Sequence, residues 1–378
     1  MKKFLKILLI FTIVIIVQIC LVIKLDIFDF SFLNVTDEQL ARYTGFYFNG
    51  LELDEKEMYA RIDEGIKMNM QRVFLGIHEN KDNEENIDLK VKDVLTAYFY
   101  DNPGCYKISN EYAITTRDFK FFKTATVQLN YITTDEEDIN IKDSELENAV
   151  NDILSKYIHE GMSDYEKELA IHDALANHIA YYEYEDINNI PSIKHTAYGA
   201  LVEKEAVCDG YSKAFKLLLD KTGIKSIIVF GSTENVPHAW NMVELEGKYY
   251  HVDVTSDKLD INNNKYVIHT YFNIDTETLL KTHVIDKTFK YPEASSEEYN
   301  YYIKNNLCLN YDDNLYIKLP QVISSQENAN VLELKVDNKY NARTIIDTLY
   351  DLNFNNWNYD KKASVSYNKI GDIYVFVK

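Results

Sequence analysis

Apolar residues recur along the chain with two different periods, and these periods predict a mixture of helices and strands. Helical spacing or helix-start signals mark the segments 54–70, 87–100, 144–159, 163–181, 208–222, 295–304 and 342–352. Alternating or short continuous apolar runs mark the segments 112–116, 124–133, 225–231, 238–245, 248–255, 271–274, 331–336, 364–367 and 372–377. Because helices and strands are interspersed without a regular βα repeat, the pattern predicts an α+β fold.

Polar residues at the predicted helix starts match known capping signals. Ser144 with Glu147 and Ser163 with Glu166 both fit the S-x-x-E capping box, and Asp54 is a candidate N-cap. A helix is therefore expected to begin at each of these positions.

Changes in composition along the chain predict five parts. They are a signal anchor at 1–25, a helical stalk with a charged linker at 26–86, a small α+β domain at 87–141, a catalytic core at 142–292 and a C-terminal α/β accessory domain at 293–378. The predicted linker is the polar run ENKDNEEN at 79–86, which follows the helical pattern of the stalk.

The segment around Cys208 holds the residues with the clearest chemistry. Cys208 directly precedes an apolar helical pattern that ends at Gly223, so its thiol is expected at a helix N-terminus. The free N–H groups and the positive end of the helix dipole favour a thiolate there, and the thiolate is the nucleophilic form. The alternative for the cysteine alone is a buried thiol that packs as a small hydrophobic side chain.

Two strands after this helix predict a partner for the thiol. Only Glu246 and Gly247 separate the segments 238–245 and 248–255, which is the length of a tight hairpin turn. In that register Trp240 faces Asp253, and His238 becomes a diagonal neighbour of Asp253 on the same face. The register therefore brings an imidazole within reach of a carboxylate.

Cys208, His238 and Asp253 together have the composition of an acyl-transfer triad. The imidazole exchanges protons with the thiol and the leaving group, while the carboxylate fixes the tautomer of the imidazole. Further candidates for the cleft or the oxyanion hole are Gly210, Tyr211, Tyr198, Trp240 and Asn241. A competing hypothesis is a zinc hydrolase that uses His238, His251 and Asp253, but no Cys/His spacing typical of a metal site supports it.

Three runs in this region, AVCDGYSKAF, HAWNMVELEGKYYHVDVTSD and YFNID, resemble the bacterial transglutaminase-like superfamily, whose fold is related to papain-like cysteine proteases. The resemblance extends over about 163–275 and implies a nucleophile helix packed on an antiparallel sheet. It also implies that Cys208 is the nucleophile, His238 the base and Asp253 the orienting acid. One departure is Ser256, where many relatives have an aromatic residue in the groove wall.

The N-terminus predicts where the protein lies. Lys2, Lys3 and Lys6 precede an uncharged run of 17 residues, 7–23, and no small-x-small cleavage site follows it. We interpret this run as an uncleaved signal anchor with the rest of the chain outside the cytoplasm, a removed signal peptide being the alternative. In that compartment Cys105 and Cys308 could form a disulfide.

Composition and net charge bear on the possible partners and on the source of the protein. The formal net charge of −20 disfavours nucleic acid as a partner. Scarce Gly and Pro with abundant Asn, Lys, Ile and Tyr are typical of bacterial proteins with low-GC coding. No cofactor or metal is predicted.

The sequence thus predicts a membrane-anchored, extracytoplasmic cysteine enzyme that acts on peptide or amide bonds through an acyl-thioester. We favour hydrolysis of protein substrates such as surface or cell-wall peptides, since water is the default acceptor in an open groove. The alternatives are a transglutaminase that cross-links glutamine side chains to amines, and a non-catalytic binding or structural module.

Overall fold

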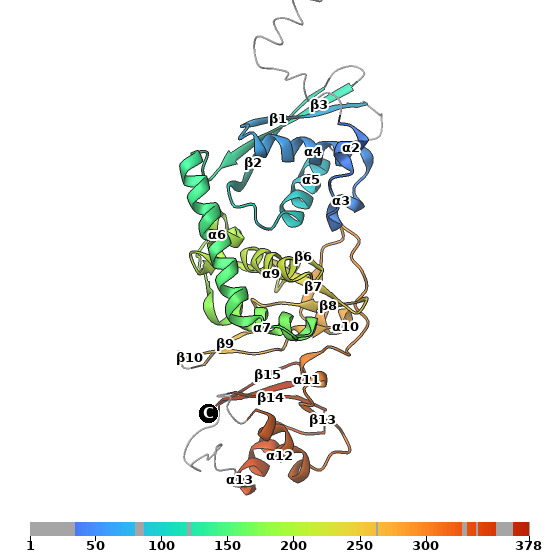
Figure 1. Cartoon of the computed structure of the whole chain (residues 1–378). Helices are drawn as coiled ribbons and strands as arrows, with labels where there is room; N and C mark the ends of the chain where they lie inside the picture. Colours follow the sequence, from blue (N-terminus) through green and yellow to red (C-terminus); the bar gives the residue numbers. More distant parts are fainter. Residues whose placement is uncertain are drawn as a thin grey trace, which may run out of the picture. The chain divides into compact units, whose positions relative to one another are not determined.

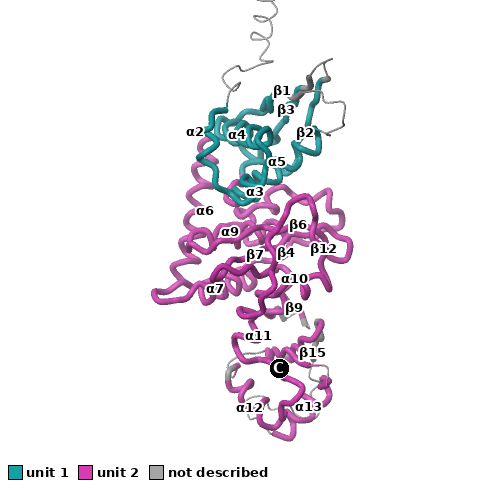
Figure 2. Tube along the Cα trace, turned by 90° about the vertical axis from the view of Figure 1, so that its right-hand side faces the viewer, with its two compact units in different colours: residues 1–102, 107–135 teal, residues 103–106, 136–378 magenta. Residues whose placement is uncertain are grey.

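The computed structural model describes residues 35–79, 87–118, 122–261, 264–326, 331–337, 339–352 and 366–377 of the chain. It has two compact units, one formed by residues within 1–102 and 107–135 and the other by residues within 103–106 and 136–378 (Figure 2). No helix in the described part of the chain is long and apolar enough to cross a membrane. The predicted signal anchor lies outside the described residues.

The first unit combines helices with a three-stranded antiparallel sheet of order β1-β3-β2. Its elements are α2 (Asp37–Leu40), α3 (Phe46–Gly50), α4 (Leu53–Lys67), β1 (Arg72–Glu79), α5 (Ile87–Asp101), β2 (Ile108–Asp118) and β3 (Phe122–Tyr131). Helix α4 buries Met58, Ile62 and Ile66, the apolar stripe that the sequence predicted. Its cap differs, because the capping box is formed by Glu52 and Glu55 and not by Asp54.

The predicted boundary at residue 86 falls inside this unit. The sequence assigned residues up to 86 to a stalk and linker, but Arg72–Glu79 forms strand β1 and pairs antiparallel with β3. The strand was not predicted because polar segments surround its short apolar part, in which Val73 and Leu75 are buried. The stalk residues and the small α+β segment therefore share one fold.

The second unit begins with helices on both sides of the segment that the sequence predicts to be catalytic. They are α6 (Glu136–Tyr157), α7 (Asp164–His178), α8 (Ala197–Leu201) and α9 (Cys208–Thr222), with the short pair β4 (Ala180–Tyr181) and β5 (Glu205–Ala206) and the 3-10 turns η2 (Ile187–Asn189) and η3 (Ser192–His195) between them. The predicted capping box of Ser163 and Glu166 is present at the start of α7. The one at Ser144 is wrong, because α6 runs through Ser144 without a break.

A five-stranded antiparallel sheet of order β11-β8-β7-β6-β12 lies next to α9 (Figure 1). Its strands are β6 (Ser226–Thr233), β7 (Val236–Leu245), β8 (Lys248–Val252), β11 (Phe272–Ile274) and β12 (His283–Ile285). The hairpin of β9 (Lys258–Ile261) and β10 (Asn264–Val267) and the helix α10 (Thr276–Leu279) complete this region. The buried core contains Phe215 and Leu218 from α9 and Val243, Tyr250 and Val252 from the sheet, so burial of apolar surface fixes the helix on the strands.

The C-terminal part has its own core around a four-stranded sheet of order β13-β14-β16-β15. Its elements are α11 (Tyr301–Lys304), β13 (Cys308–Leu309), α12 (Leu315–Ser325), β14 (Val331–Val336), α13 (Ala342–Asp351), β15 (Ser366–Ile370) and β16 (Ile373–Val377). The predicted strand 331–336 and helix 342–352 are present, whereas α12 was not predicted and the helix expected at 295–304 is reduced to α11. Cys308 is a free thiol, so it does not pair with Cys105.

Candidate active site

Helix α9 holds the candidate nucleophile at its first residue. The helix begins at Cys208 after an extended N-cap residue, Val207, and ends at Gly223, whose φ of 83° is the left-handed conformation that glycine adopts without strain. The Cys208 side chain is partly exposed. The predicted position of the thiol at a helix N-terminus is confirmed.

The hairpin register predicted from the sequence is also confirmed. Glu246 and Gly247 both have positive φ, 50° and 76°, as a two-residue type I′ turn requires. Leu245 pairs with Lys248 at the turn, and the ladder continues to the pairing of Asn241 with Val252. Asp253 lies one residue beyond the ladder, and its Oδ2 is 2.8 Å from Nε2 of His238.

The local backbone fixes the Asp253 carboxylate. Its Oδ1 accepts hydrogen bonds from the backbone N–H groups of Thr255, at 3.0 Å, and Ser256, at 3.2 Å. The Ser256 hydroxyl donates to Oδ2 at 2.5 Å. The serine that departs from the pattern of relatives therefore supports the carboxylate in this chain.

A second imidazole, which the sequence analysis missed, contacts the same carboxylate. His283 Nε2 lies 3.2 Å from Asp253 Oδ2, and its Nδ1 lies 2.8 Å from the Thr282 hydroxyl. His283 is on β12, which joins the sheet beside β6, so its position depends on a long-range strand pairing. The only feature of the sequence that could have indicated this role is that His283 stands at the start of a short apolar segment, 283–285.

The electrostatics of these groups favour a protonated imidazole at His238. Burial lowers the pKa of His238, but the charge of Asp253 and hydrogen bonds with Asp253 and Cys208 outweigh it and raise the pKa to about 10. Burial raises the pKa of Asp253, but His238 and His283 outweigh it and hold the pKa well below its usual range. At neutral pH, His238 is then protonated beside an ionised Asp253.

The other predicted cleft residues are buried in contacts of their own. Trp240 is fully buried, and its indole N–H donates to Nδ1 of His251 at 3.1 Å. Its ring stacks on His238, with 6.0 Å between the ring centroids. Trp240 therefore packs against the His238 ring, and its N–H is not available to an oxyanion because it is bonded to His251.

Tyr198, Tyr211 and Asn241 likewise have partners inside the protein. The Tyr198 hydroxyl donates to Glu145, the Tyr211 hydroxyl to the Ile179 carbonyl at 2.5 Å and the Asn241 amide to the Ser212 carbonyl at 3.0 Å. All three side chains are at most 5% exposed. These bonds join α8 to α6, α9 to the end of α7, and β7 to α9.

Gly210 has a different role from the predicted one. A Cβ atom at this position would lie 2.5 Å from the Lys194 carbonyl oxygen and 2.8 Å from Cβ of Ala206. Atoms of the protein itself fill the space beside Gly210, so this space is not available to a substrate. Gly210 thus permits close packing of the segments that precede Cys208.

His251 does not join His238 and Asp253, as the zinc hypothesis required. It lies on β8 between Trp240 and Thr276, whose hydroxyl is 3.1 Å from its Nε2. Burial lowers the pKa of His251 to about 3, which keeps the ring neutral. Among the described residues, His283 takes the place next to His238 and Asp253 that the zinc hypothesis gave to His251.

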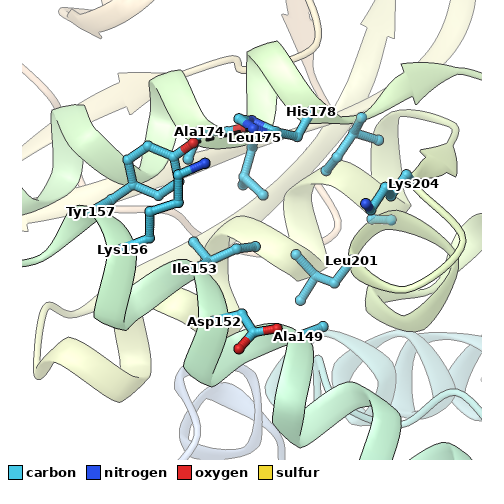
Figure 3. A pocket seen from close by; sticks show the side chains of 12 residues that line it. Ala149, Asp152, Ile153, Lys156, Tyr157, Ala174, Leu175, His178, Leu201 and Lys204 are labelled. Atoms are coloured by element: carbon cyan, nitrogen blue, oxygen red, sulfur yellow. Dashed lines mark hydrogen bonds between the residues drawn. The ribbon is translucent and has the colours of Figure 1, made fainter.

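A pocket of about 210 Å³ lies elsewhere in the second unit, between α6, α7 and α8 (Figure 3). Its walls are mainly apolar, with Ile153, Leu175 and Leu201 among them, and Lys156 and Lys204 contribute charge. None of the three triad residues lines it. The pocket is therefore separate from the candidate catalytic groups.

Comparison with known proteins bears directly on this region. The sequence model of the transglutaminase-like superfamily matches residues 152–254, which include Cys208, His238 and Asp253. The mouse protein kyphoscoliosis peptidase is 27% identical over 136 residues, a match that covers 32% of this chain and 20% of that protein. The chain thus spans about a fifth of the length of this curated relative.

Two solved structures are similar at low identity. A TGase structure is 17% identical with a TM-score of 0.28 and covers 52% of each chain. A candidate cysteine protease from Cytophaga hutchinsonii is 13% identical with a TM-score of 0.26, covering 48% of this chain and 71% of that one.

Proposed function

We propose that this chain, whose central domain belongs to the transglutaminase-like superfamily, is a cysteine enzyme that cleaves peptide or amide bonds through an acyl-thioester. The proposal is supported above all by one observation: Nε2 of His238 lies 2.8 Å from the buried carboxylate of Asp253, and the Cys208 thiol at the start of α9 acts on the same imidazole. This is the order of nucleophile, base and orienting group that acyl transfer requires.

The chemistry follows from the charges of these groups. The Cys208 thiolate attacks the carbonyl carbon, and the protonated His238 gives its proton to the leaving nitrogen as the C–N bond breaks. The products of this first step are a free amine and a thioester on Cys208. A water molecule then attacks the thioester, His238 accepts a proton from that water, and the carboxylic acid leaves as the thiolate is restored.

The acceptor of the acyl group distinguishes the two enzymatic possibilities. Water as acceptor gives a protease or amidase, whereas a primary amine gives a transglutaminase with the same first step. We propose hydrolysis as the main outcome, because the Cys208 side chain is partly exposed and water is the default acceptor in an open groove. A non-catalytic module would keep the same residues but would form no thioester.

We further propose that the enzyme acts outside the cytoplasm, held by its N-terminal apolar run. This rests on the lysines before that run and on the absence of a cleavage signal after it. The substrates would then be surface proteins or cell-wall peptides. The net charge of −20 favours substrates that are not strongly acidic.

The direct test is to incubate the purified full-length chain with a peptide library, with and without a primary amine, and to identify products by mass spectrometry. We expect peptides cleaved with uptake of water, and little amine incorporation. Cys208→Ala should abolish product formation, whereas the matched variant Cys308→Ala should retain it. Amine-linked products as the main species would establish the transglutaminase alternative, and equal turnover in Cys208→Ala would contradict the enzymatic proposal.

A further inference from the structure

A second cluster of ionisable side chains joins the catalytic region to the C-terminal sheet. His172 and Asp173 lie on α7, His269 follows β10, Asp257 follows the loop that carries the catalytic carboxylate, and Glu333 lies on β14. The two imidazoles and the carboxylates of Asp257 and Glu333 are almost completely buried, whereas the Asp173 side chain is 40% exposed. The proposed triad chemistry uses none of these groups.

Three atoms of the cluster converge on one point. His172 Nδ1 and His269 Nε2 each lie 3.0 Å from the same oxygen, Oδ1 of Asp173. These three atoms lie within 4.8 Å of one another. His172 and Asp173 are neighbours on α7, whereas His269 is 96 residues from Asp173, so the tertiary fold brings the third atom to the other two.

The opposite nitrogen of each imidazole faces a further carboxylate. His172 Nε2 is 3.1 Å from Asp257 Oδ2, and His269 Nδ1 is 2.9 Å from Glu333 Oε1. These carboxylates are themselves fixed, because Asp257 accepts from the backbone N–H of Tyr271 at 2.8 Å and Glu333 accepts from the Tyr302 hydroxyl at 2.8 Å. Histidines that bind metal ions typically donate their second ring N–H to such a fixed carboxylate.

This arrangement leaves acceptors facing one another. A neutral imidazole has one N–H; when that N–H is donated to Asp257 or Glu333, the nitrogen near Asp173 presents a lone pair to a carboxylate oxygen. Either two further protons or one divalent cation must lie among these three atoms. Either one brings the net charge of the three carboxylates from −3 to −1, which reduces the cost of their burial.

We propose that His172, Asp173 and His269 bind one divalent first-row transition-metal ion of the zinc class, and that this ion links α7 to the C-terminal sheet. Two imidazole nitrogens and one carboxylate oxygen are ligands that such ions accept at about 2.0–2.2 Å. Ligand atoms at that distance from a tetrahedral ion lie slightly more than 3.0 Å apart, so the Asp173 oxygen needs to move only slightly away from the two nitrogens to admit the ion. The exposed edge of Asp173 gives the ion a path of approach and leaves a coordination position for water.

The triad itself is a poorer site for such an ion, although His238, Asp253 and His283 also converge. The second nitrogen of His283 faces the Thr282 hydroxyl and that of His238 faces the Cys208 thiol, so neither ring is oriented by a further carboxylate. The sequence analysis predicted no metal because no Cys/His spacing along the chain is typical of a metal site. The true neighbour of His172 is His269, which only the tertiary structure brings near.

The test measures zinc binding by the purified full-length chain, in competition with a chromogenic chelator. To remove the triad as a competing ligand, the measurement is made on a chain that carries Cys208→Ala and His238→Ala. We expect one Zn²⁺ per chain and a higher melting temperature with zinc than without it. A chain with this background that binds no zinc would overturn the proposal, whatever the behaviour of further variants.

Zinc binding by variants of the cluster then shows whether the ion lies at His172, Asp173 and His269. In the same background, Asp173→Asn keeps the shape of a partly exposed side chain and should weaken zinc binding at least 10-fold, and Asp257→Asn should weaken it by about 10- to 100-fold. His159→Ala is the matched control, since His159 is exposed and outside the cluster, and it should bind zinc as the parent does. Undiminished binding in both Asp173→Asn and a His172→Ala, His269→Ala chain would also overturn the assignment.

Discussion

At the scale of single residues, a buried carboxylate sets the charge of the imidazole beside it. Asp253 has four hydrogen-bond donors other than His283, from the His238 ring, the Ser256 hydroxyl and two backbone N–H groups. Such a carboxylate stays ionised and stabilises the protonated imidazole beside it. The pH dependence of catalysis should therefore report on Asp253.

Replacing Asp253 by Asn tests this charge. Because the carboxylate raises the pKa of His238 to about 10, its loss should lower that pKa toward the ordinary value of about 6.5. The protonated imidazole is then lost at lower pH, so the alkaline limb of the profile of kcat/KM should move to lower pH, with reduced but measurable turnover. Asp220→Asn, which removes a carboxylate paired with Lys216 on α9, should leave the profile unchanged. An alkaline limb that stays in place in Asp253→Asn would show that the carboxylate does not act through His238.

Glu168 on α7 gives a prediction for stability. Burial raises the pKa of Glu168 to about 8, partly opposed by the Asn273 amide, which donates to it at 3.0 Å. Between about pH 4.5 and 8, the folded chain keeps a proton that the unfolded chain has released, so this group lowers stability as pH rises.

Glu168→Gln removes the proton linkage while keeping the shape of the side chain. The variant should melt at a higher temperature than the parent at pH 8 and at nearly the same temperature at pH 5. The expected gain is up to a few kcal/mol, since one pKa unit corresponds to about 1.4 kcal/mol. Calorimetry in a metal-chelating buffer measures this, with the exposed Glu147→Gln on α6 as control. Equal differences at both pH values would contradict the linkage.

At the scale of elements, the hairpin of β7 and β8 and the strands beside it bring His238, Asp253 and His283 together. The turn at Glu246 and Gly247 and the register of β7 and β8 could be predicted, because both depend on a few adjacent residues. The place of His283 could not, since it depends on β12 pairing with β6 across a long stretch of chain. Strand β1 was not predicted for the same reason, because its partner β3 lies about fifty residues further along the chain.

Gly231 on β6 shows how tightly these strands fit. A Cβ atom there would lie 1.9 Å from the Val284 carbonyl oxygen and 3.0 Å from the Trp240 ring. Gly231→Ala should displace β12, withdraw His283 from Asp253 and destabilise the chain by about 1–3 kcal/mol. Thermal unfolding and turnover both measure the effect. Gly50→Ala is the control, because a Cβ atom at Gly50 meets no atom within 4 Å, and full stability of Gly231→Ala would mean that β12 does not pack as described.

The cleft residues were harder to predict than the triad. Tyr198, Tyr211, Trp240 and Asn241 are near the catalytic residues in sequence, but each is buried and bonded within the protein. Whether a polar side chain near a triad faces substrate or core depends on which element covers it. That information is distributed over distant segments and is not contained in a local motif.

At the scale of the whole molecule, the described residues form two compact units, and the candidate catalytic groups and the proposed metal ligands all belong to the second. The sequence analysis divided the chain into more parts, because changes in composition do not reveal which strands pair. The proposed location outside the cytoplasm depends instead on residues 1–34, which lie outside the described part of the chain.

The location has its own test in intact cells. If the apolar run 7–23 remains as an anchor, the chain should stay with the cells, and added protease should release its folded part from their surface. Western blotting of cells and medium after mild proteolysis measures this. A cytoplasmic protein expressed in the same cells controls for lysis, and a mature chain in the medium that begins near Phe30 would show that the run is removed.

The most direct test of the proposed nucleophile is the rate at which the three cysteines of the described residues react with iodoacetamide at neutral pH. Mass spectrometry of peptides can follow Cys105, Cys208 and Cys308 in the same sample. If Cys208 is a thiolate paired with His238, it should be alkylated far faster than the other two, and His238→Ala should remove most of that advantage. Equal rates at the three cysteines, or a fast rate at Cys208 that His238→Ala leaves unchanged, would contradict the account.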